Sequence, residues 1–418
     1  MIQKNSAFAA LRHRDFRLLW IGLIVSVTGS QMQTVAINWH VYDLTKSAVA
    51  LGLVGLFRGV PVILCSLAGG VVADAVNRRR LMMITQSVML ISAALLATIT
   101  LAGLRSVWPI YLLSALASAA SAFDTPARQS LMPSLVPLED FPNAVSLSMI
   151  VFNVATISGP AIAGLLLAQS GPALIYAFNA ISFLAVIIAV VAMRVSGSPE
   201  LQSDRRQALS FGALKEGLQF VWRTPIMVQT MTLDFVATFF ASATLLLPIF
   251  ARDVLHVGAH GYGLLAAAPA IGSVITAFFM ARLGTFQRQG RLVVWAVAVY
   301  GVATAAFGVS RVFWLSLLML ALTGAADTVS TVLRQTIRQL VTPNYLRGRM
   351  TSINMMFFMG GPQLGELEAG LIAALIGAPL SVVVGGFGST IAAGLAALKS
   401  KSLMKFEIAD VANEITIR

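Results

Sequence analysis

The chain has 418 residues, of which 57% are hydrophobic and only 11% are charged, and its mean hydropathy is +0.83. These values exclude an ordinary soluble globular protein, so the lipid bilayer is the main solvent of this chain. The net charge of +12 is spread over loops between apolar stretches, and no soluble domain is present to use it, so we expect no nucleic-acid partner.

Twelve apolar stretches follow one another along the chain, each long enough to cross a bilayer as a helix of roughly 20 residues. The first is too long for a signal peptide and lacks a cleavage pattern, so we expect no processing. A single cysteine, Cys65, excludes an internal disulfide. The predicted spans are 17–41, 48–74, 80–103, 107–133, 143–168, 173–193, 226–251, 260–284, 290–310, 312–338, 349–376 and 380–398.

An internal repeat divides the chain, because residues 124–165 reappear in register at about 330–371. We therefore predict an all-α integral membrane fold of twelve helices in two six-helix repeats, residues 1–193 and 225–418, joined by a linker at 194–224. Parallel repeats of this kind place a substrate site between the halves. The matching pairs include Arg128 with Arg334, Pro137 with Pro343, Gly159 with Gly365 and Gly164 with Gly370.

The basic residues predict the orientation. Of the 29 Lys and Arg residues, four lie in loops on one side, four lie within spans, and the remaining 21 lie on the other side. The positive-inside rule assigns that other side, with both termini, to the cytoplasm. We expect a multi-pass protein of the bacterial cytoplasmic (inner) membrane that functions as a monomer.

The linker carries an amphipathic pattern between Leu209 and Trp222, with Phe211, Leu214, Leu218 and Trp222 at steps of three and four residues. This spacing predicts a helix lying on the inner leaflet. Such a helix would tether the two halves or regulate them.

Two motifs resemble signatures of the major facilitator superfamily. Between spans two and three, Gly70 is followed by Asp74 and then by Arg78, Arg79 and Arg80, although Ala75 and Asn77 depart from the usual pattern. An Asp beside basic residues at a helix end can form a charge-assisted latch. The simpler alternative, ordinary positive-inside charges, explains the arginines but leaves Asp74 unexplained.

In span five, Gly159, Pro160 and Gly164 resemble the kink of the drug/proton antiporters of that superfamily, with Ala163 in place of a usual glycine. Pro160 removes a backbone donor and the small residues allow close packing, which a plain packing helix would also need. The segments 11–20, 123–137 and 385–388 are similar to the branch that contains the enterobactin exporter and related drug exporters. The resemblance implies proton-coupled export, with spans four and ten bordering a central cavity.

Ionisable residues within spans are costly in a bilayer and are functional candidates for that reason. Asp124 and Arg128 share one face of span four, and Asp327 and Arg334 share one face of span ten. These acids would either form structural or gating ion pairs or carry protons. Our proton-coupling candidates are Asp327, Glu366, Glu368 and Asp234, and our gating or ion-pair candidates are Arg58, Asp74, Arg78, Arg79, Asp124, Arg128 and Arg334.

Glu366 and Glu368 lie near the middle of span eleven, and Arg58 lies at a similar depth in span two. The resemblance implies that these spans meet, so we predict a pair between Arg58 and one of the glutamates. The alternative is a polar partner within the same half.

Polar residues in span one and methionines in span eleven supply our cavity candidates, Gln31, Thr34, Asn38, Met355 and Met359. The chain has no Walker loop, metal-ligand cluster or activated nucleophile, so we expect no enzyme activity and no cofactor, with the proton gradient as energy source. We therefore predict a secondary active exporter of an amphiphilic small molecule, drug-like or siderophore-like, by proton antiport. The alternatives are an importer of a polar nutrient and a non-transporting membrane sensor on the same fold.

Overall fold

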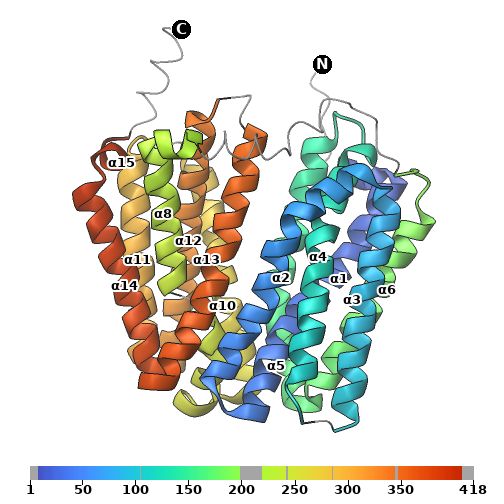
Figure 1. Cartoon of the computed structure of the whole chain (residues 1–418), viewed down its shortest axis with the longest axis horizontal. Helices are drawn as coiled ribbons and strands as arrows, with labels where there is room; N and C mark the ends of the chain where they lie inside the picture. Colours follow the sequence, from blue (N-terminus) through green and yellow to red (C-terminus); the bar gives the residue numbers. More distant parts are fainter. Residues whose placement is uncertain are drawn as a thin grey trace. The chain divides into compact units, whose positions relative to one another are not determined.

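The computed structural model describes residues 8–103, 105–197, 219–241, 243–284, 286–343 and 347–406. The described part of the chain is helical, and ten of its helices are long and apolar enough to cross a membrane. Two further long helices, α4 and α13, complete the expected set of twelve. The long helices are α1 (Arg14–Thr45), α2 (Ala48–Ala75), α3 (Arg78–Leu101), α4 (Trp108–Leu131), α5 (Phe141–Ser170), α6 (Pro172–Ala192), α8 (Pro225–Phe240), α10 (Gly258–Leu283), α11 (Gln289–Val309), α12 (Phe313–Val341), α13 (Arg347–Ile376) and α14 (Ala378–Lys399) (Figure 1).

Helix ends follow from the local sequence. Gly171, between α5 and α6, and Gly377, between α13 and α14, both have positive φ angles, 70° and 87°, which glycine adopts without a steric cost. A proline then stands in the first turn of each following helix. Backbone N–H groups in the first turn have no partner within the helix, so a proline there costs no hydrogen bond. These two turns lie at equivalent positions of the sequence repeat, so the repeat extends to backbone conformation.

The chain forms two compact units. Unit 1 comprises residues 1–46, 57–201 and 258–267, and unit 2 comprises residues 47–56, 202–257 and 268–418. The first turns of α2 therefore belong to unit 2, and the first turns of α10 belong to unit 1. Residues 198–218 lie outside the described residues, so the amphipathic helix expected in the linker stays a prediction.

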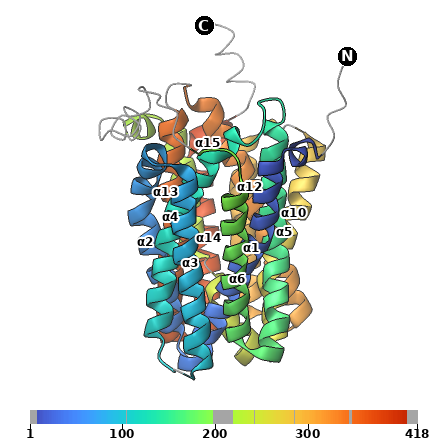
Figure 2. The ribbon, with the colours of Figure 1, turned by 90° about the vertical axis from the view of Figure 1, so that its right-hand side faces the viewer.

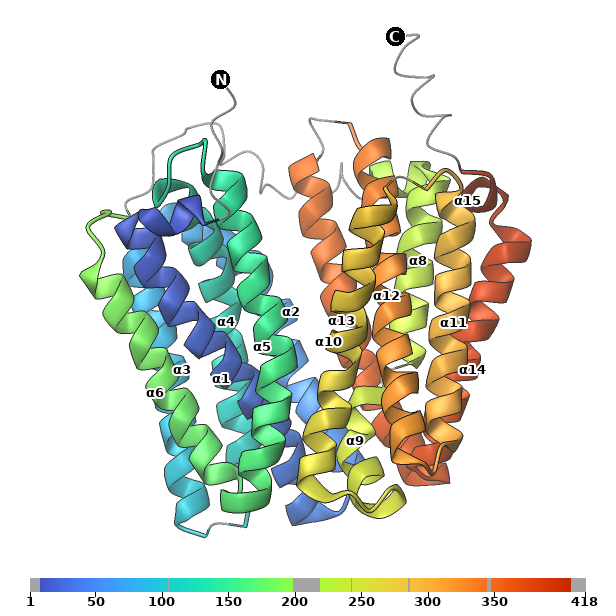
Figure 3. The ribbon, with the colours of Figure 1, turned by 180° about the vertical axis from the view of Figure 1, so that it is seen from behind.

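The helices within each unit pack in the same order. In unit 1, α1 packs against α5 and α6, and α3 packs against α4 and α6, as Figure 2 shows for α3 and α6. In unit 2, α8 packs against α13 and α14, and α11 packs against α12 and α14 (Figure 3). These neighbours correspond, so the two units repeat the same order of helix packing.

The seventh span is the exception to regular helical structure. We predicted one apolar run over 226–251, and α8 instead ends at Phe240 and is followed by η4 (Ala243–Leu246), α9 (Leu247–Ile249) and the π-helix η5 (Phe250–Val254). The hydroxyl of Tyr300 donates a hydrogen bond to the carbonyl of Ala241 at 3.2 Å. A side chain from a neighbouring helix thus satisfies a backbone group at the break, as an interrupted membrane helix requires.

Candidate functional site: buried charges in each unit

A buried ion pair joins α8 to α12 in unit 2. Nη2 of Arg334 lies 2.7 Å from Oδ1 of Asp234, and the two side chains are only 2% and 6% exposed. An unpaired charge at this depth would lose its hydration without compensation, so the two opposite charges compensate one another. Asp234 stands on the last regular turns of α8, before the break at Phe240.

A second carboxylate approaches the same guanidinium. Oδ1 of Asp327 lies 4.0 Å from Nη2 of Arg334, and the Asp327 side chain is 48% exposed. The hydroxyl of Thr331 lies between them: it accepts a hydrogen bond from Arg334 at 3.0 Å and donates one to Asp327 at 3.4 Å. One arginine is therefore shared by a buried carboxylate and a half-exposed one.

Arg338, one turn beyond Arg334 on α12, is also buried and interacts electrostatically with Asp234. Sequence reasoning paired Asp327 with Arg334 from their spacing but did not select Arg338. The available signal was the four-residue step between the two arginines, which puts both on one helix face.

In unit 1, the buried carboxylate of Asp124 on α4 is held by polar side chains of α3. Its Oδ1 accepts hydrogen bonds from the hydroxyl of Thr85 at 2.9 Å and the amide of Gln86 at 3.0 Å. Arg128, one turn along α4, attracts the same carboxylate electrostatically. Sequence reasoning missed Thr85 and Gln86, although two adjacent polar residues in a membrane span are themselves a signal.

Polar residues of α1 bond to α6 and α2 as well as to backbone carbonyls of α1 itself. The amide of Asn179 on α6 donates to Oε1 of Gln33 at 2.8 Å. The hydroxyl of Thr34 accepts a hydrogen bond from Nη2 of Arg58 at 3.2 Å. Oδ1 of Asn38 is buried and has no hydrogen-bond partner among the described residues. Of the cavity candidates in span one, Thr34 is therefore bonded, and Asn38 retains an unused acceptor.

Glu366 lies against a glycine of α2 within unit 2. A Cβ atom at Gly55 would stand 2.5 Å from Oε2 of Glu366 and 2.7 Å from its Cβ, so only glycine leaves room for this glutamate. Glu368, two residues further along α13, is partly buried. The pair predicted between Arg58 and one of these glutamates stays a prediction.

Glycines of the antiporter-like kink lie at close crossings in unit 1. A Cβ atom at Gly159 would stand 2.6 Å from Cβ of Gln31 on α1. A Cβ atom at Gly164 would stand 2.7 Å from Cα of Gly263 in the first turns of α10. Pro160 is buried beside them. These small residues allow backbones to approach, as is common where membrane helices cross.

The arginines after α2 hold the end of α6. The guanidinium of Arg79 donates to the carbonyls of Val195 at 2.7 Å and Val190 at 2.9 Å, and the backbone N–H of Arg78 donates to the carbonyl of Gly197. A cation beside unpaired carbonyls at a helix C-terminus is favourable. The side chains of Asp74, Met355 and Met359 lie outside the described residues.

No group of three or more His, Cys, Asp or Glu side chains able to hold a metal ion occurs in the described ranges. The architecture of two six-helix units defines a membrane transporter of the major facilitator type. A family model described as transmembrane secretion effector matches residues 5–416, and the chain belongs to this family. Transporters of this type are not a class of enzymes.

Two relatives are similar over nearly the whole chain. The enterobactin exporter EntS of Citrobacter koseri is 24% identical over 394 residues, which cover 94% of each chain. The multidrug efflux pump Tap of Mycolicibacterium fortuitum is 25% identical over 368 residues, which cover 86% of this chain and 89% of the relative. The sequence predicted an efflux function, and relatives of this chain include efflux proteins.

Solved structures support the fold. A bacterial homologue of the iron transporter ferroportin in an inward-facing state has a TM-score of 0.68 and 15% identity, covering 93% of this chain and 99% of that one. The nucleoside transporter NupG has a TM-score of 0.68 and 14% identity, covering 94% of this chain and 99% of that one. At these identities the likeness concerns the fold alone.

Proposed function

We propose that this protein is a secondary active exporter of an amphiphilic small molecule, drug-like or siderophore-like, driven by proton antiport across the bacterial inner membrane. It would act as a monomer with both termini in the cytoplasm. Efflux relatives over nearly the full length of the chain favour export. The observation that carries proton coupling is the arginine shared between Asp234 and Asp327.

The unequal exposure of the two carboxylates supports different roles for them in this proposal. Asp234 is buried against Arg334, so taking up a proton would leave the guanidinium without its nearest counter-charge. Asp327 is half-exposed and lies further from Arg334, so protonating it would cost less than protonating Asp234. In this proposal Asp327 carries the proton, while Asp234 keeps Arg334 in place.

A proton on Asp327 changes the charge balance around Arg334. With Asp327 ionised, the guanidinium is drawn toward both carboxylates, and Thr331 bonds to both Arg334 and Asp327. With Asp327 neutral, the attraction toward that side falls and Arg334 interacts with Asp234 alone. Release of the proton on the other side of the membrane restores the first arrangement. The protonation state of Asp327 would therefore shift the equilibrium between two positions of α12 relative to α8 during transport.

Direction and substrate class are tested together by accumulation assays. Host cells without their own exporters would express this protein and be challenged with dyes, macrolides and siderophores. Export predicts lower accumulation of at least one compound than in cells with an empty vector, and collapse of the proton gradient should abolish the difference. Increased uptake of a nutrient would instead support the importer alternative.

A further inference from the structure

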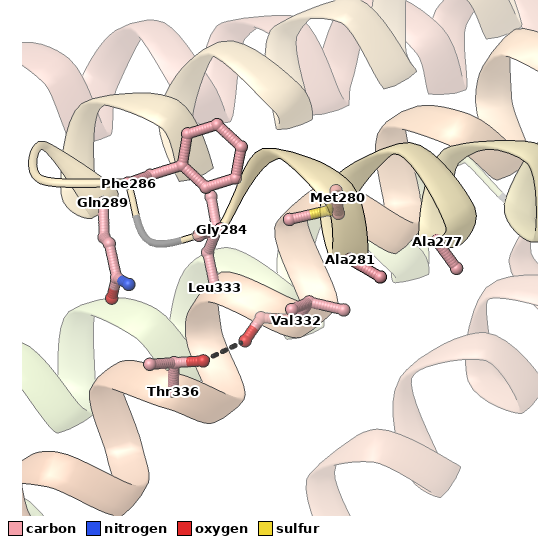
Figure 4. Close-up of a pocket in the computed structure, with 9 residues that line it drawn as sticks. All are labelled: Ala277, Met280, Ala281, Gly284, Phe286, Gln289, Val332, Leu333 and Thr336. Carbon is pink, nitrogen blue, oxygen red and sulfur yellow. Dashed lines mark hydrogen bonds between the residues drawn. The ribbon is translucent and has the colours of Figure 1, made fainter.

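A groove in unit 2 lies beside the turn that joins α10 to α11, and neither Arg334 nor Asp234 is among the residues that line it (Figure 4). Its volume is about 300 Å³, at the lower end of the range for small-molecule sites. Its walls are mostly apolar: Ala277 and Ala281 come from α10, Gly284 follows the end of that helix, and Leu333 and Thr336 come from α12.

The groove follows from the size of the side chains along α10. Nearer the start of α10, this helix is in close contact with α12, since the hydroxyl of Ser273 donates a hydrogen bond to the carbonyl of Gly324 at 3.0 Å. Further along, Ala277 and Ala281 stand one turn apart with small side chains that leave the space between the helices unfilled. Both alanines are exposed, so the groove is open along its side.

One polar group in the groove has no partner. Gln289, the first residue of α11, is 3% exposed and extends from the turn toward α12 (Figure 4). Its carbonyl Oε1 accepts no hydrogen bond from the described residues. A buried acceptor without a donor is unfavourable, so a ligand that brings an O–H or N–H group to this point would be favoured.

The surroundings of the groove are basic. Arg282, Arg288 and Arg291 are exposed around the turn, and no acidic residue occurs in the sequence between Asp253 and Asp327. The positive-inside rule assigns this turn to the cytoplasmic side, where anionic lipid headgroups attract arginines. An apolar groove at this level, with exposed arginines in the adjoining turn and helix ends and an unpaired acceptor among its lining residues, matches the chemistry of a lipid.

We propose that this groove binds an anionic glycerophospholipid of the inner leaflet, phosphatidylglycerol. One acyl chain lies along Ala277 and Ala281, the phosphate interacts with the arginines of the turn, and a hydroxyl of the glycerol headgroup donates to Oε1 of Gln289. Phosphatidylglycerol combines a negative charge with hydroxyl donors, whereas phosphatidylcholine has no net charge and no headgroup donor.

Native mass spectrometry of the purified full chain with equal amounts of phosphatidylglycerol and phosphatidylcholine tests the proposal. An arginine near an anionic headgroup favours binding roughly five-fold, so phosphatidylglycerol should be retained at least about five-fold more than phosphatidylcholine. Ala281→Phe fills the groove and should abolish this preference. Ala374→Phe is a matched control, because Ala374 is an exposed alanine of α13 outside the groove. Equal retention of phosphatidylglycerol by wild type and Ala281→Phe would overturn the proposal.

Gln289→Leu separates the headgroup contact from folding. The substitution removes an unpartnered acceptor, so the lipid-free variant should melt at the same temperature as wild type or higher. Added phosphatidylglycerol should raise the melting temperature of wild type but should raise that of the variant no more than phosphatidylcholine does. An undiminished phosphatidylglycerol shift in the variant would contradict the role of Gln289. A fall in its lipid-free melting temperature would also contradict it, by revealing that the amide has a structural role in the protein itself.

Discussion

Replacing Asp234 with leucine tests the buried pair by leaving Arg334 without its partner at 2.7 Å. Breaking a buried ion pair in this way typically costs about 3–5 kcal/mol, because the remaining charge stays out of water without compensation. We expect a value near the lower end of that range, since Asp327, 4.0 Å from Arg334, supplies some of the lost attraction. Replacing both members, Asp234→Leu with Arg334→Leu, should restore much of the stability, because an apolar pair carries no uncompensated charge.

The free energy of unfolding can be followed by titrating the purified protein with a denaturing detergent. The double-mutant cycle should give a coupling of more than about 1 kcal/mol. Asp43→Leu is a suitable control, because Asp43 forms an exposed pair with Lys46 and such pairs contribute at most about 1 kcal/mol. Additive effects of the Asp234 and Arg334 substitutions would show that the two side chains do not stabilise one another. A loss of stability in Asp43→Leu as large as that in Asp234→Leu would show that burial does not set the size of the effect.

Two further substitutions test the packing around the other candidate residues. Gly55→Ala brings a methyl group into steric conflict with the side chain of Glu366 and should destabilise the protein by about 1–3 kcal/mol in thermal unfolding. Gly70→Ala is the control in the same helix: a methyl group there has no atom within 4 Å, so the unfolding midpoint should not fall. Gln86→Leu removes a hydrogen bond to the buried carboxylate of Asp124 and should cost about 1.5–3 kcal/mol by the same measurement, and an unchanged midpoint would mean that Asp124 does not depend on it.

Much of the architecture follows from the sequence, because a membrane helix must be continuously apolar and its ends are marked by Gly and Pro. The turns at Gly171 and Gly377 have the same conformation because the repeat preserves the glycine that a positive φ favours. The break after Phe240 could not be predicted from the sequence. Hydropathy does not indicate which backbone carbonyls accept a hydrogen bond from a neighbouring side chain such as that of Tyr300.

The candidate site was predictable only along single helices. Periodicity related Asp327 to Arg334 because both lie on α12, and it related Asp124 to Arg128 on α4. The partners on other helices could not be found in this way. Asp234 lies 100 positions before Arg334, and only the packing of α8, α12 and their neighbours brings the two together.

In the proposed mechanism, Asp327 couples substrate export to proton movement. Purified protein would be reconstituted into liposomes containing a pH-sensitive dye, with a compound that the accumulation assays identify as a substrate. Wild type should move protons when substrate is added, and Asp327→Asn should lose this flux while still binding substrate. Asp43→Asn, which changes an exposed aspartate, should behave as wild type. Undiminished substrate-driven proton flux in Asp327→Asn would show that Asp327 does not carry the proton.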